Sequence, residues 1–142
     1  MNKMSAAVVA TAIGILAAPH VANAYTVFTG TLTLKVTVSI VSNISTSSAI
    51  QCSFSAFAFG TSDTAEESDT VTATRSGSTA VCTLPIPYEW HLYNASQDTV
   101  SLSYTVTALD SNANGRSTTN GIGSIGVPAN GANLSYSVGA RL

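Results

Sequence analysis

The feature that most constrains the fold is an alternating stretch near the start of the chain, TGTLTLKVTVSIV from Thr29 to Val41. Between positions 32 and 40 every even position is apolar, whereas the odd positions hold threonine, lysine or serine. This period of two is typical of a β-strand with one buried face. Such a strand needs a partner, which is either another strand of the same chain or a strand of a second chain.

The N-terminal 24 residues have the features of a secretory signal peptide. Lys3 is followed by an apolar run from Ala6 to Ala18, by Pro19 and by the small-residue motif Ala22-Asn23-Ala24, in the order found in such signals. At about 13 residues, the apolar run is shorter than the roughly 20 needed to cross a bilayer. We therefore expect cleavage after Ala24 and an exported protein, located in the periplasm, at the cell surface or outside the cell.

Residues 25–142 have the size of a single domain. Removing 24 of the 142 residues leaves 118, which is enough for a two-layer core. This part has four basic and seven acidic side chains, a formal charge of −3, so nothing in it attracts nucleic acid or an anionic membrane. We also expect no membrane span after signal cleavage.

Alternating patterns and turn residues predict an all-β domain. No segment after residue 24 has a helical period, and seven short strands in this length favour an immunoglobulin-like antiparallel β-sandwich. In the fourth predicted strand, Pro85 and Pro87 remove two N–H donors from one side, which indicates a sheet edge or a bulge. The predicted strands are Thr26 to Val41, Ala49 to Phe59, Thr70 to Arg75, Ser78 to Tyr88, Thr99 to Leu109, Gly121 to Val127 and Ala132 to Leu142.

The chain has two cysteines, Cys52 and Cys82. In an exported chain an even pair is most simply a disulfide. The alternative, two free thiols or a metal pair, has less support because the sequence has no CxxC motif and no histidine near either cysteine. A bridge that closes this loop would contribute about 3.5 kcal/mol in the chain-entropy model.

Three further motifs have a weaker chemical interpretation. Gly121, Gly123 and Gly126 match a dinucleotide-binding pattern, but a turn follows instead of a helix, so a glycine-bent strand is favoured. The stretch from Asp110 to Gly115 resembles the first half of a calcium loop without its final acid, which favours an Asn-Gly turn. The acids between Asp63 and Asp69 lack the spacing of a cation site and indicate a solvated loop. No metal and no cofactor are expected.

The segment YEWHLYN brings together Tyr88, Trp90 and His91, which could form a ligand platform by stacking on a carbohydrate. The competing interpretation is a packed core, because Tyr88 and Trp90 continue the apolar face of the preceding strand. His91 is the only histidine after residue 24, and no nucleophile motif points to it. We therefore expect that the protein is not an enzyme.

The N-terminal segment YTVFTGTLTLKVTVSIV has Gly30 among its alternating apolar positions and is followed by Cys52, by Phe59-Gly60 and by Cys82 in STAVC. These features resemble the chaperone/usher pilins, including the spore coat U-like branch. The resemblance implies an immunoglobulin-like subunit that lacks one strand and has a periplasmic chaperone and an outer-membrane usher as partners. It also implies polymerisation, in which each N-terminal extension fills the groove of the next subunit. The implied donor-strand positions are Gly30, Leu32, Leu34, Val36 and Val38.

Two functional hypotheses remain open. The first is an exported structural subunit of a surface fibre, a pilus or fimbria used in adhesion, built from copies of this chain or related subunits. The second is a self-complete secreted or envelope β-sandwich that binds an unknown ligand, with the strand in residues 25–41 paired inside its own chain. The alternating pattern fits both hypotheses equally.

Overall fold

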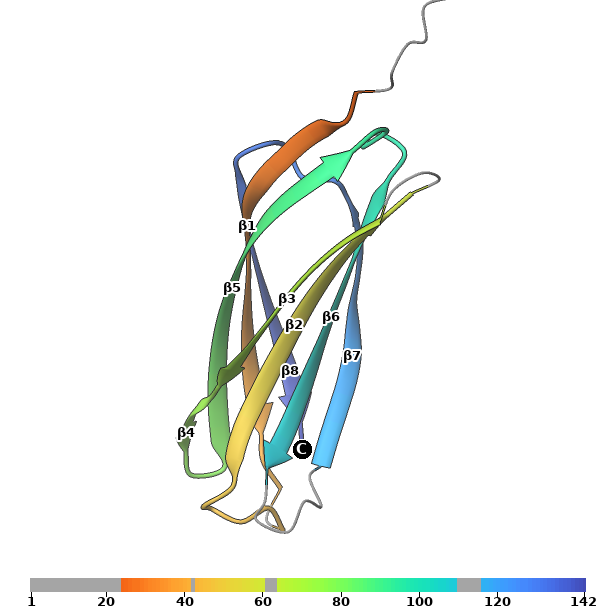
Figure 1. Ribbon diagram of the computed structural model, residues 1–142. Helices are drawn as coiled ribbons and strands as arrows, with labels where there is room; N and C mark the ends of the chain where they lie inside the picture. Colours follow the sequence, from red (N-terminus) through yellow and green to blue (C-terminus); the bar gives the residue numbers. More distant parts are fainter. Residues whose placement is uncertain (1–23, 42, 61–63, 110–115) are drawn as a thin grey trace, which may run out of the picture.

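The computed structural model describes residues 24–41, 43–60, 64–109 and 116–142, and in this part the regular structure is strand, with no helix (Figure 1). The strands form two four-stranded sheets, with the orders β4-β5-β1-β8 and β3-β2-β6-β7. The predicted all-β sandwich is therefore confirmed. The strands are β1 (Thr26–Ser39), β2 (Ala49–Phe59), β3 (Thr64–Thr72), β4 (Thr74–Ser76), β5 (Thr79–Leu92), β6 (Thr99–Leu109), β7 (Arg116–Gly126) and β8 (Ala132–Arg141).

The first strand of the sandwich lies between two strands from later in the chain. β1 pairs with β5 in antiparallel orientation over its full length and with β8 in parallel orientation from Gly30 to Ser39. The other strand pairs of the two sheets are antiparallel. The sheet of β1 thus joins the first and the last strand of the chain (Figure 1).

The core lies between the inward faces of the two sheets. Burial alternates along β1, β2, β5 and β6, so every second residue is removed from water. The predicted disulfide is confirmed: Cys52 of β2 is bonded to Cys82 of β5, and the two Cα atoms are 6.3 Å apart. Because β2 and β5 belong to different sheets, this bond links the two layers through the core.

The acids between Asp63 and Asp69 indicate a solvated loop, and this prediction is wrong for residues 64–69. Thr64–Thr72 forms β3, which pairs with β2 at the edge of its sheet. A predicted strand from Thr70 to Arg75 is divided between β3 and β4. An edge strand pairs on one side and exposes much of its side-chain surface, so β3 keeps a polar sequence while β2 supplies the hydrogen-bonding partner.

The glycine-rich segment near residue 121 is part of a strand. This segment belongs to β7, which pairs with β6 and begins five residues before the predicted start at Gly121. The pairing shifts register between Leu102 and Ser103, and Gly123 in the facing part of β7 has a φ of +131°. A β-bulge with a glycine at a positive φ explains this pattern, and the interpretation as a glycine-bent strand is confirmed.

Candidate functional site

The candidate functional element is β1, together with the groove that holds it between β5 and β8. The five predicted assembly positions lie on its inward face. Leu32, Leu34, Val36 and Val38 are fully buried. Among the described strands, β8 has no neighbour in its sheet except β1, so β1 is the element that connects β8 to the rest of the sheet.

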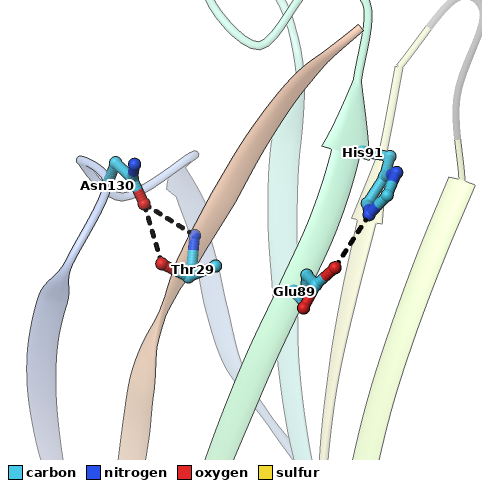
Figure 2. A network of polar contacts seen from close by, with 4 residues as sticks. All are labelled: Thr29, Glu89, His91 and Asn130. Carbon is cyan, nitrogen blue, oxygen red and sulfur yellow. Dashed lines mark hydrogen bonds and ion pairs between the residues drawn. The ribbon is translucent and has the colours of Figure 1, made fainter.

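Both ends of β8 are tied to β1 by hydrogen bonds. The backbone N–H and the hydroxyl of Thr29 donate to Oδ1 of Asn130, both at 2.9 Å (Figure 2). The N–H of Gly131 donates to the carbonyl of Thr29 at 2.7 Å. At the other end, the backbone of Leu142 donates to Ser39 at 3.0 Å and accepts from Val41 at 2.9 Å. These contacts fix the register of the parallel pair at both ends.

Gly30 makes the closest contact between β1 and its groove. It lies directly opposite Tyr88 of β5, and a Cβ atom at this position would overlap with the Tyr88 hydroxyl and with the carbonyl oxygen of Ala132. Tyr88 is buried, and burial raises the pKa of its phenol. The aromatic ring therefore covers the space that the glycine leaves, a cross-strand arrangement in which any larger residue at position 30 is excluded.

We expect Gly30→Ala to lower the free energy of unfolding by about 1–3 kcal/mol, because the added methyl group forces β1 away from β5 and β8. The matched control is Gly121→Ala in β7, where an added Cβ has no atom within 4 Å. Urea unfolding of the two variants measures the difference. Equal midpoints for both variants would contradict the close packing at Gly30.

Along most of its length, the outer edge of β5 has no paired strand among the described residues. Its outer neighbour β4 pairs only with Thr79–Val81, and Pro85 and Pro87 lie beyond that part. β1 pairs with both prolines without a register shift, so the missing N–H donors face the open edge. The prediction of a sheet edge at these prolines is confirmed, and they limit pairing with a further strand.

Two of the other sheet edges also carry features that oppose pairing. In β3, Glu67 and Asp69 lie opposite the buried Ala56 and Phe54, so charged residues occupy the inward face of an edge strand. β7 contains the glycine bulge. β8, by contrast, is a regular strand of ten residues without proline, and its register with β1 has no shift. Of the four edges, β8 has the backbone best suited to accept another strand.

The predicted ligand platform does not form as a unit. Tyr88 and Trp90 are 3% and 0% exposed and stack on each other with ring centroids 4.3 Å apart, so both belong to the core. His91 alone faces outward. Its ring lies 4.7 Å from the ring of Tyr25, which in turn meets Tyr93 edge to face at 6.1 Å. The strand period explains this division, because residue 91 has the opposite parity to residues 88 and 90.

His91 has one acidic neighbour. Its Nε2 lies 3.1 Å from Oε1 of Glu89, two residues earlier on the same strand (Figure 2). Both side chains are well exposed, at 47% and 67%, so water competes for this contact. In the described ranges, no cluster of three or more histidine, cysteine, aspartate or glutamate side chains is placed to hold a metal ion.

The three weaker motifs of the sequence, which are the half calcium loop, the acidic segment and the glycine pattern, have different outcomes in the structure. The segment from Asp110 to Gly115, which resembles half of a calcium loop, lies outside the described residues, as does Asp63. Glu66, Glu67 and Asp69 are part of β3. The glycines of the nucleotide-like pattern are part of β7, without the strand-to-helix turn that a phosphate site requires.

Sequence reasoning missed two exposed aromatic residues on the outer face of β2. Phe57 and Phe59 are 38% and 41% exposed, and their rings stack with centroids 5.8 Å apart. The sequence pattern indicates their exposure, because both phenylalanines continue the outward-facing positions of β2 that Ser53 and Ser55 occupy. An aromatic residue at an outward position of a strand indicates a surface role more strongly than one in phase with the core.

Comparison of the chain with protein-family models, with curated proteins and with solved structures finds no match. None of the described residues forms a helix long and apolar enough to span a membrane.

Proposed function

We propose that this chain is an exported structural subunit of a surface fibre, and that its copies assemble by exchanging β1. The observation that carries the proposal is the place of β1, which is the first strand in the sequence and yet a central strand in its sheet. Once the predicted signal peptide is removed, one end of β1 is free. The strand can then leave one sandwich and enter another without passing through a loop.

An empty groove in place of β1 is energetically unfavourable. Burying the side chains of Leu32, Leu34, Val36 and Val38 contributes roughly 6–12 kcal/mol, taking about 1.5–3 kcal/mol for each. This is comparable with the whole stability of a small domain. A sandwich that has lost its own β1 therefore needs another strand in the groove, either from a second copy or, during export, from a chaperone.

The connection to the body supports a linear assembly. β1 ends at Ser39 and β2 begins at Ala49, so residues 40–48 would link a donated strand to its own body. When each copy donates to the next, the contact is heterologous, and it extends into a fibre when the rotation between copies does not close a ring. The prolines of β5, the inward acids of β3 and the bulge of β7 oppose lateral pairing at these three edges, which leaves exchange of β1 and addition at the edge of β8 as the two routes of association.

The second candidate is a self-complete binding domain. It is favoured by the pairing of β1 with β5 and β8 of its own chain, with both ends of β8 tied to it. In this case the groove is never vacated, and the exposed aromatic residues are the functional part of the surface. The two candidates differ in whether β1 crosses between chains.

A cross-linking experiment with two single-cysteine variants tests the exchange. Thr37 of β1 and Gly139 of β8 are partners in the parallel pair, both are exposed, and Gly139 has room for a side chain. Chains with Thr37→Cys and chains with Gly139→Cys are unfolded in urea with the native disulfide intact, mixed, refolded and oxidised. If β1 crosses between copies, we expect covalent dimers that contain one chain of each kind on a denaturing gel.

The double variant, which carries both cysteines in one chain, shows whether the pair can be bonded at all. Thr37→Cys mixed with Ser124→Cys is the matched control, because Ser124 lies in the other sheet. An intrachain bond in the double variant without covalent dimers in the mixture would overturn the fibre proposal and support the self-complete domain.

A further inference from the structure

The outer face of the sheet β3-β2-β6-β7 carries an ordered array of hydroxyl groups. In one row, Thr70, Ser53, Thr105 and Thr119 lie side by side across all four strands. Their oxygens form hydrogen bonds in pairs, at 2.7 Å between Ser53 and Thr70 and at 2.8 Å between Thr105 and Thr119. Because neighbouring strands are about 4.8 Å apart, the face offers hydroxyl donors and acceptors at regular, short intervals.

A shallow hollow of about 250 Å³ opens on this face. It is lined by one acidic side chain, Glu66, and by six serine and threonine side chains of β2, β3 and β6. The hydroxyl of Ser55 donates to Oε1 of Glu66 at 2.9 Å. A carboxylate accepts hydrogen bonds and a hydroxyl both accepts and donates, so the hollow can bind a molecule that carries many hydroxyl groups of its own.

The exposed aromatic pair adjoins the hollow. Phe57 follows Ser55 on the outer face of β2 and lies directly opposite Glu66 of β3. Phe59 continues the same face, and the two rings are nearly parallel, with an interplanar angle of 23°. Two large apolar side chains that stack in water beside a polar hollow mark a binding surface, because such residues are usually placed in the core.

We propose that this face binds a neutral glycan chain. A sugar ring has an apolar side formed by C–H groups and a rim of hydroxyls, which match the stacked phenylalanines and the hydroxyl-lined hollow respectively. The charged group that lines the hollow is the Glu66 carboxylate, and it repels anionic sugars. The inference is independent of strand exchange, since the face is the same in a monomer and in a fibre.

Binding of neutral hexasaccharides to the monomeric exported chain tests the proposal. Cellohexaose, maltohexaose, mannohexaose and N-acetylchitohexaose are titrated calorimetrically, with a hyaluronan hexasaccharide as the anionic comparison. We expect at least one neutral probe to bind and hyaluronan to bind more weakly. The double variant Phe57→Ala/Phe59→Ala should weaken the binding at least about tenfold, because it removes the stacking platform.

The matched control is Val81→Ala, which shortens an exposed apolar side chain on the other sheet and should leave the affinity unchanged. Thermal unfolding of each variant confirms that the fold is retained, as expected for exposed positions. Failure of all four neutral probes to bind would overturn the proposal. Equal affinity in the double phenylalanine variant, or tighter binding of hyaluronan than of the neutral probes, would also overturn it.

Discussion

Removing the disulfide is expected to lower the free energy of unfolding by about 3.5 kcal/mol, equivalent to a fall in Tm of roughly 15 °C for a domain of this size. The bond between Cys52 and Cys82 spans 30 positions of the sequence and joins strands of opposite sheets. In the unfolded chain it restricts the ensemble, and in the folded chain it lies in the core, where both residues are at most 1% exposed. The double variant Cys52→Ala/Cys82→Ala, compared with the oxidised wild type by urea unfolding, measures the loss.

Reduction of the wild type with dithiothreitol distinguishes the stability that the disulfide bond contributes from the stability that the packing of the two side chains contributes. It breaks the disulfide and leaves both sulfur atoms in the core, whereas the alanine variant also removes packing volume. Both samples should be destabilised, the alanine variant by the larger amount. A loss below about 1 kcal/mol in both samples would show that the link between the layers contributes little to stability.

The second large effect is expected for Trp90→Ala. This variant should lower the free energy of unfolding by about 3–5 kcal/mol, the usual range for removal of a buried aromatic side chain. Trp90 is fully buried and stacks on Tyr88 with an interplanar angle of 23°. Its Nε1 has no hydrogen-bond partner among the described residues. Trp90→Phe should therefore cost less than the alanine variant, because it keeps much of the ring packing and removes a buried donor that lacks a partner.

Phe57→Ala is the matched control for a single aromatic side chain, because Phe57 is exposed on the outer face of β2. Its effect should stay within about 0.5 kcal/mol. Thermal and urea unfolding of the three variants measure the order of effects. If Trp90→Ala were no more destabilising than Phe57→Ala, the placement of Trp90 in the core would be wrong.

The strands with one buried face were the part of the fold that the sequence predicted best. β2 and β6 begin and end where their alternating patterns begin and end, at Ala49–Phe59 and Thr99–Leu109. Alternation reflects burial, and burial is what defines these strands. The same rule separated Trp90 from His91, since residues of opposite parity face opposite sides of the sheet.

The features that the sequence did not predict have a common physical cause. They depend on pairing between strands, and this pairing leaves no pattern in the sequence of either strand. β3 is acidic and polar, and its strand conformation depends on hydrogen bonds to β2. The parallel pair of β1 and β8 could not be predicted, because the period of two is the same for parallel and antiparallel neighbours. The phenylalanines of the proposed glycan site did leave a pattern, at Phe57 and Phe59, but the period alone does not say what covers an outward side chain.

The pairing of β1 with β8 also affects the order in which the chain can fold. The hydrogen bond between Thr29 and Asn130 joins residues 101 positions apart, so it cannot form until nearly the whole chain has been synthesised. Until then β1 can pair only with β5, and its other side stays open. Contacts so distant in sequence also form slowly. A chain that is still incomplete therefore exposes one side of β1 as an unpaired strand edge, and such an edge is a template for pairing with another chain.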